Sequence, residues 1–563
     1  MADEDQGSSF LRRFYPWMKN WEGRLTNLLE IFRKEEIDWL LQESLIDEPN
    51  QQGIQFVIAV TQTDYKDEPD VGDDGKPSSS RTTALHHAAR LSPSDANILV
   101  PGLFKIYDRF DVNYTDVESG LTHFHIACEF GCEEVLQRFL ELGQDPNLVA
   151  ANASVDPPLH TALKSANANV IELLLKHKAD PNLTNGDGSM ALHVICEKHN
   201  EDVSLTKIFF EICERRYPQP VQVDAKNGSG QTPLHLAVIH DKKKVAEILL
   251  KKGADPNSTD WEGTTPLHII CAKPVDDYFL ERFFKICAYV EKTVNINAQD
   301  TNGDPPLFLA VEGGHIWMAK LLVDKDVDPN LVNEKGSTAL HIVCKNFEYM
   351  FLTWSIYDKL SAQIDAQDKL GNTPLHLALL NRSRNTAKVL LLRYDANPTL
   401  ANRDGSTALH LMCERNDDFL NVLLGMNPRY RKWLLAQDEF RGTPFDEALR
   451  LGNVEWARSL LRARADPNGE TPHPHREGEN IQSSEPPLNS IYASYDSYVR
   501  DYSVEQFFQI NDELNQTVKV DAQGEHGRSP LYWAVASILP KAVDALLNKN
   551  NRIFLNRIFI SYL

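Results

Sequence analysis

A four-residue motif, Thr-Pro-Leu-His or a close variant, recurs along this chain at intervals of 33 to 43 residues. The full motif occurs at 232–235, 265–268 and 373–376. Such a chain stacks small similar units, so we expect a repeat architecture of about thirteen units rather than one globular core. Near matches end at His86, His125, His160, His193, His341 and His410, and degenerate copies stand at 305–308, 443–446, 486–489 and 529–532.

Each unit carries the signals of two helices joined by turns. The motif proline suits the first turn of a helix, where no amide hydrogen is needed, and the motif threonine can cap that helix. An apolar stripe with three- and four-residue spacing follows, as in the segment 245–250, and predicts a second helix. Gly253 and the turn formers at 255–257 then end the unit.

A second regularity alternates along the chain. Every second motif histidine is followed three residues later by a cysteine, and these even-numbered units also carry longer second segments, as at 205–223 and 280–296. We therefore interpret the unit of duplication as a pair. The cysteines are expected to be core thiols rather than metal ligands or a disulfide framework. They are Cys128, Cys196, Cys271, Cys344 and Cys413.

The motif and its period resemble the ankyrin repeat over about residues 82–550. The alternating LHxxC units and the aromatic-rich block at 14–41 further resemble the expanded ankyrin-repeat family of parasitoid wasps. The resemblance implies an all-α solenoid of helix-turn-helix repeats with β-turn fingers. It implies a binding role but no catalytic reaction. It also implies that each motif histidine braces its turn by hydrogen bonds to backbone and to a neighbouring threonine.

The aromatic-rich helical pattern in residues 1–63 is expected to cap the first repeat, whose apolar end would otherwise face water. The alternative is a short helical docking motif. The tail after residue 550 is abruptly apolar, and a packed terminal helix or an incomplete sequence would both explain it. The expected order is a cap at 1–63, an acidic linker at 64–81, repeats 1–11 at 82–468, a linker at 469–484, degenerate repeats 12–13 at 485–550 and the tail at 551–563.

The charge of the chain and the motifs that it lacks exclude several classes of function. Lys and Arg number 58 against 80 Asp and Glu, a net charge of −22, so nucleic acid is not an expected ligand. No run approaches the roughly 18 apolar residues of a membrane span, and the start is acidic, unlike a signal peptide. We therefore expect a monomer in the cytoplasm, with the nucleus left open. Phosphate-loop, dinucleotide, GxSxG and HExxH motifs are absent from the sequence, so we expect no enzyme, cofactor or metal.

Large side chains at the tips of the fingers are the candidate contacts, because aromatic residues are enriched in binding hot spots. The candidates are Trp261 between Asp260 and Glu262, then Phe440 and Leu370. The alternative for each is packing onto the neighbouring finger. We expect a protein-binding scaffold whose acidic concave groove selects another protein. A basic segment is the suggested feature of that partner. The rival is a ubiquitin-ligase substrate adaptor whose C-terminal F-box-like or PRANC-like module is missing or unrecognised.

Overall fold

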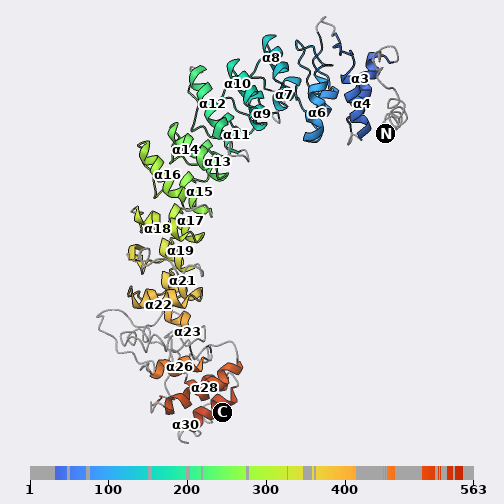
Figure 1. Cartoon of the computed structure of the whole chain (residues 1–563). Helices are drawn as coiled ribbons and strands as arrows, with labels where there is room; N and C mark the ends of the chain where they lie inside the picture. Colours follow the sequence, from blue (N-terminus) through green and yellow to red (C-terminus); the bar gives the residue numbers. More distant parts are fainter. Residues whose placement is uncertain are drawn as a thin grey trace. The chain divides into compact units, whose positions relative to one another are not determined.

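The computed structural model describes the chain in two compact units, one formed by residues 1–270 with 275–295 and the other by 271–274 with 296–563. Helices make up the regular structure of the described residues, where β-bridges occur only singly (Figure 1). The described residues are 32–46, 51–71, 77–149, 155–197, 203–216, 220–273, 278–325, 327–345, 358–360, 363–413, 448, 451, 453–462, 497–513, 518, 520, 529–536 and 539–549.

The first unit is a stack of helix pairs. Within a pair, as in α5 with α6 or α13 with α14, two short helices pack on each other, and first helices stack on first helices while second helices stack on second helices. Two layers result, with the apolar core between them. The helices are α3 (Lys34–Glu43), α4 (Gln51–Thr61), α5 (Ala84–Ala89), α6 (Pro93–Leu103), α7 (His123–Glu129), α8 (Glu133–Glu141), α9 (Pro158–Lys164), α10 (Ala168–Lys176), α11 (Ala191–Glu197), α12 (Val203–Arg216), α13 (Pro233–Ile239), α14 (Lys243–Lys251) and α16 (Tyr278–Tyr289), with α15 (Pro266–Ala272) crossing the boundary.

The second unit continues the same plan. Here α17 pairs with α18 and α21 with α22, while α17, α19, α21 and α23 stack in one layer. Near the C-terminus α28 and α29 both pack on α30. The helices are α17 (Pro306–Glu312), α18 (Ile316–Asp324), α19 (Ala339–Lys345), α21 (Pro374–Leu380), α22 (Arg384–Leu392), α23 (Ala408–Cys413), α26 (Val454–Arg462), α28 (Ser497–Glu513), α29 (Pro530–Ala536) and α30 (Pro540–Lys549).

The local signals act as the sequence predicts. Pro233 is the first residue of α13, and Thr232 is its N-cap. On α14 the side chains of Val245 and Leu249 are buried, and Gly253 ends the unit with a φ of 103°, a conformation that glycine adopts at no steric cost. The all-helical repeat fold is confirmed.

The alternation of long and short second helices holds only in part. Helices α12 and α16 have 14 and 12 residues, against nine in α10, α14, α18 and α22. In the second repeat, however, α8 also has nine residues. The alternation of thiols is more regular, because Cys128, Cys196, Cys271 and Cys344 are all buried in first helices, as predicted for core thiols.

The two N-terminal helices extend the two layers of the stack. Helix α3 contacts α5 and α4 contacts α6, so these helices lie against the apolar end of the first repeat. The segment that follows them, expected to be an acidic linker, is partly packed: Tyr65 and Asp67 are each only 5% exposed. Asp67 therefore belongs to the folded unit. Among the described residues, no helix is long and apolar enough to cross a membrane.

Candidate functional site

The turns between repeats are five-residue loops that we call fingers. In each, the first residue is Asn or Asp, whose Oδ1 accepts backbone N–H bonds from the third and fifth residues at 2.8–3.1 Å. The fourth is a glycine with φ of 73–75°, which L side chains rarely adopt. The second and third residues are thereby left at the tip. The fingers are 185–189, 227–231 and 260–264 in the first unit and 300–304, 333–337, 368–372 and 402–406 in the second.

Backbone hydrogen bonds fix successive fingers in register. In the second unit, the amide of the second residue of one finger donates to the carbonyl of the third residue of the preceding finger. Glu334 donates to Asn302, Lys369 to Lys335 and Arg403 to Leu370, each at 2.8 Å. In the first unit, Trp261 donates to Ser229 at 3.4 Å and Gly228 to Asp187 at 2.8 Å. The tips of neighbouring fingers therefore form a row held by the main chain.

The motif histidines connect each repeat to the finger that follows it. The amide of Thr232 donates to Nδ1 of His235 at 3.1 Å, and Nε2 of His235 donates to the carbonyl of Thr264 in the next finger at 3.0 Å. Burial lowers the pKa of His235, so the ring is neutral at pH 7 and keeps one acceptor and one donor nitrogen. This confirms the bracing role that the resemblance implied. His160, His193, His341 and His376 reach the next finger in the same way.

Trp261 lies at the tip of finger 260–264 and contacts the preceding finger. Its Nε1 donates to the carbonyl of Gly228 at 2.9 Å, and Lys226 Nζ lies 5.2 Å from the ring centroid. A Cβ added to Gly230 would come within 2.6 Å of the ring. Yet Trp261 is 64% exposed. The indole thus packs on the neighbouring finger, which was the alternative interpretation, while most of its surface still faces solvent.

The other sequence candidates take different places. Oδ1 of Asp260 accepts bonds from the amides of Glu262 and Thr264, so Asp260 builds the turn, whereas Glu262 is exposed at the tip. Leu370, in finger 368–372, is 64% exposed. Phe440 lies outside the described residues.

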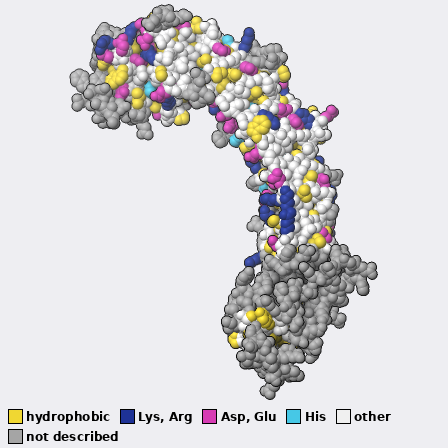
Figure 2. Space-filling view, turned by 180° about the vertical axis from the view of Figure 1, so that it is seen from behind, with side chains coloured by type: hydrophobic (Ala, Val, Ile, Leu, Met, Phe, Trp, Pro, Cys, Tyr) yellow, Lys and Arg dark blue, Asp and Glu magenta, His cyan; other side chains and the backbone are white. Residues whose placement is uncertain are grey.

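Three basic residues at finger tips of the second unit were not among the predicted contact residues. Lys335, Lys369 and Arg403 are exposed on three consecutive fingers. Figure 2 shows dark blue Lys and Arg side chains gathered on the described part of this unit. The overall negative charge of the chain had favoured an acidic binding surface instead.

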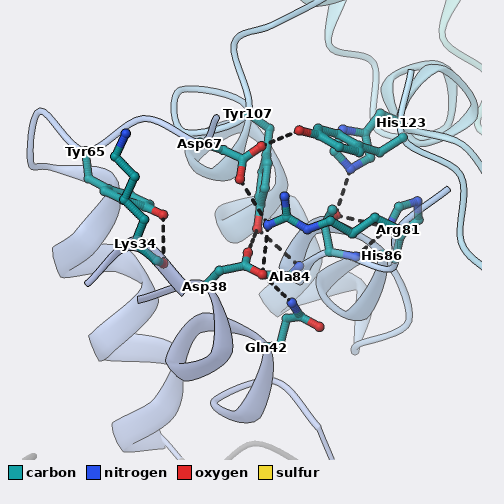
Figure 3. A network of polar contacts seen from close by, with 12 residues as sticks. Lys34, Asp38, Gln42, Tyr65, Asp67, Arg81, Ala84, His86, Tyr107 and His123 are labelled. Carbon is teal, nitrogen blue, oxygen red and sulfur yellow. Dashed lines mark hydrogen bonds and ion pairs between the residues drawn. The ribbon is translucent and has the colours of Figure 1, made fainter. Parts of the chain in front are cut away.

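A buried polar network joins the N-terminal helices to the first repeat (Figure 3). The Arg81 guanidinium lies between two carboxylates, with Nη2 at 2.8 Å from Asp38 and 3.0 Å from Asp67. The Tyr107 hydroxyl donates to Asp38 at 3.1 Å and the Tyr114 hydroxyl to Asp67 at 2.5 Å. Both carboxylates are therefore paired and hydrogen-bonded, as buried charges require.

His123 extends this network into the second repeat. It occupies the motif-proline position of Thr122-His123-Phe124-His125, and its amide donates to the carbonyl of Tyr114 at 3.0 Å. Its Nε2 lies 2.7 Å from the hydroxyl of Thr83. A hydroxyl beside an imidazole is the geometry of a nucleophile and its base, but Thr83 is 0% and His123 1% exposed. Substrate has no access, so the arrangement stabilises the fold.

Burial also suppresses thiol chemistry. It raises the pKa of Cys196 to about 12 and that of Cys287 to about 11, and the thiolate is the reactive form. We expect iodoacetamide at pH 8 to leave both unmodified in the folded protein and to alkylate both in urea, as peptide mass spectrometry would show. Rapid native alkylation of Cys196 would contradict its place in the core. No group of His, Cys, Asp and Glu suited to a metal occurs among the residues that the structure describes.

Comparison with known proteins identifies the repeat. The family model "Ankyrin repeats (3 copies)" matches residues 159–260, 257–333 and 325–402, and "Ankyrin repeats (many copies)" matches 124–175. An ankyrin repeat protein of Acanthamoeba polyphaga mimivirus is 24% identical over 60% of this chain and 41% of its own length. The nuclear factor NF-kappa-B p105 subunit of Gallus gallus is 29% identical over 43% and 24%. The chain thus covers less than half of either relative.

Among solved structures, the ankyrin repeat domain of Bcl-3 aligns with 43% of this chain and 99% of its own, at 24% identity and a TM-score of 0.35. The narrower resemblance to the wasp family stays a prediction. Ankyrin repeats typically serve as protein–protein interaction modules, and stacked helix pairs with braced fingers are the arrangement seen here. The chain is therefore an ankyrin-repeat protein.

Proposed function

We propose that this chain is a non-enzymatic scaffold that binds a protein partner through its finger tips, with Trp261 as the anchor. The observation that carries the proposal is an indole that is 64% exposed although the preceding finger holds it in place. An aromatic residue fixed before binding loses little conformational entropy on association, and Trp is enriched in hot spots. Such a side chain favours recognition over packing alone.

Charge near Trp261 suggests the character of the partner. Glu262 is exposed beside it, and Asp187 is exposed at the tip two fingers earlier. A partner segment with Lys or Arg would pair with these carboxylates. Because such exposed pairs are screened by ions, affinity should fall as salt rises.

We expect Trp261→Ala to weaken partner binding by about 30-fold or more, the effect of losing a hot spot of about 2 kcal/mol. The matched control is Tyr289→Ala, which removes an aromatic side chain that is 78% exposed on α16, away from the fingers. The measurement is quantitative mass spectrometry of proteins captured by wild type and both variants, followed by titration of the recovered partner.

Partners retained equally by wild type and Trp261→Ala, with the fold intact by circular dichroism, would refute the anchor. The capture also tests the ubiquitin-ligase adaptor, because cullin or F-box-binding subunits would then be recovered with all three proteins. One experiment therefore distinguishes the binding scaffold from the ubiquitin-ligase adaptor.

A further inference from the structure

We propose that fingers 333–337, 368–372 and 402–406 of the second unit bind an extended acidic segment of a partner protein. The inference rests on the proposed protein-binding function, but it uses other residues than Trp261 and a ligand of opposite charge. We call this surface the basic row and define it by Lys335, Lys369, Leu370 and Arg403.

Main-chain bonds place these residues side by side. The amide of Lys369 bonds to the carbonyl of Lys335, and the amide of Arg403 to that of Leu370, each at 2.8 Å. The order along the row is therefore cation, cation, apolar residue, cation. All four are exposed, Leu370 by 64%.

The cations of the basic row form no ion pair within the described part of the chain. Many other cations of the array hold carboxylates, as Arg90 holds Asp116 at 2.6 Å. Three unpaired cations on adjoining turns repel one another. In a chain with net charge −22, such a cluster is better explained by an acidic ligand than by composition.

The nearby acids offset the row only in part. Asp304, in the preceding finger, attracts Lys335 without forming an ion pair with it. The carboxylate of Asp368 is engaged in its own turn, accepting from the amides of Leu370 and Asn372 at 2.9 and 2.8 Å. Glu334 and Asp404 are exposed on the two outer fingers. These two acids frame a positive centre and would disfavour a ligand that runs on as a long polyanion.

The spacing of the row suits an extended peptide. Packed helices lie about 8–10 Å apart, and successive fingers follow successive repeats, so three fingers span roughly 20 Å. An extended chain advances about 3.3 Å per residue, which gives about three residues per finger. The fitting ligand therefore carries acids at about every third position and an apolar side chain between two of them, opposite Leu370.

Nucleic acid fits less well than an acidic peptide. Only three cations line the row, its one large apolar side chain is Leu370 rather than an aromatic platform for bases, and the net charge of the chain opposes a long polyanion. An acidic segment of a protein supplies the charge without a continuous phosphate backbone.

The test is a 12-residue peptide library displayed on phage and selected on the full-length chain, with the enriched peptides titrated by fluorescence anisotropy. We expect enrichment of Asp and Glu at about every third position. Lys335→Glu/Lys369→Glu/Arg403→Glu should weaken the selected peptides at least tenfold. The control, Lys320→Glu/Lys345→Glu/Lys388→Glu, changes the net charge equally within the same unit but away from the tips, and should change affinity by less than threefold.

Enrichment of basic or uncharged peptides would overturn the proposal, and so would equal losses in the two triple variants or displacement of the peptides by a 12-nucleotide single-stranded DNA at lower concentration. Trp261→Ala separates this inference from the proposed anchor. It should leave binding of the acidic peptides unchanged, so either claim can fail while the other stands.

Discussion

Replacing Arg81 with methionine is expected to destabilise the N-terminal end of the first unit by about 3–5 kcal/mol, because removing one member of a buried charge cluster leaves the others uncompensated. The side chains of Asp38 and Asp67 are only 15% and 5% exposed, and both lie within 3.0 Å of the guanidinium. Burial already raises the pKa of Asp67. Without Arg81 both carboxylates would stay largely desolvated with no cation beside them.

Hydrogen exchange with mass spectrometry measures the Arg81→Met effect locally. In a repeat stack, stability is a sum of neighbouring terms, so amides of α3 to α6 should lose protection while those of α17 to α22 keep it. The control is Arg109→Met, whose ion pair with Asp111 is about half exposed on both sides and should contribute less than about 1 kcal/mol.

A rescue variant separates charge from packing. Arg81→Met/Asp38→Asn/Asp67→Asn removes the unpaired carboxylates and should recover part of the lost protection. Full protection of α3 in Arg81→Met alone would show that the network does not hold the N-terminal helices.

The fold could be predicted because its signals are local and repeat. A proline at the helix start, a capping threonine and a glycine at the turn are each read within one unit, and recurrence at Thr232 and Thr373 removes the ambiguity of a single copy. The exposure of Trp261 also follows from its place in a five-residue finger. Its contact with Gly228 does not, because that depends on the exact register of two fingers.

The network at Arg81 could not be predicted because its members are brought together by packing. Asp38, Asp67 and Arg81 come from a helix, a segment of acidic composition and the approach to the first motif, with no shared period. His123 did carry a signal, since it replaces the motif proline. The basic row carried one too: Lys335, Lys369 and Arg403 follow one another at 34 residues, the repeat period.

Lowering the pH from 7 to 5 is expected to destabilise the first two repeats by about 4 kcal/mol. Burial lowers the pKa of His86 and of His125 to about 4 each, against about 6.5 in the unfolded chain. Between these values the unfolded state binds more protons than the folded state, so stability falls as pH falls, by about 2 kcal/mol per histidine at pH 5. The raised pKa of Asp67 acts in the opposite sense and offsets part of this loss.

His123 is buried in the same repeats, and burial lowers its pKa well below the ordinary value, so it adds to the loss. Geometry explains why protonation of His86 and His125 should cost more than that of the later motif histidines. Nε2 of His86 and of His125 is buried and has no hydrogen-bond partner among the residues that the structure describes, whereas Nε2 of His235 or His376 donates to a carbonyl of the next finger. A proton added to the ring must enter on the nitrogen that lacks its hydrogen. In His235 and His376 that nitrogen is Nδ1, which already accepts from a backbone amide, and protonation there breaks a bond but leaves Nε2 satisfied. In His86 and His125 a charged ring would also keep an unpaired N–H in the core, a larger penalty.

Exchange protection of α5 and α7 at pH 7 and pH 5, corrected for intrinsic rates, measures the effect. His86→Asn/His125→Asn keeps an acceptor near the position of Nδ1 but cannot titrate. This variant should be less stable than wild type at pH 7, because part of each buried ring is lost. From pH 7 to pH 5 it should lose less further stability than wild type, and the remaining loss should come mainly from His123. An equal loss from pH 7 to pH 5 in wild type and variant would assign the acid sensitivity to other groups. A smaller loss in the variant than in wild type would establish that His86 and His125 help to set the lower pH limit of the array at its N-terminal end.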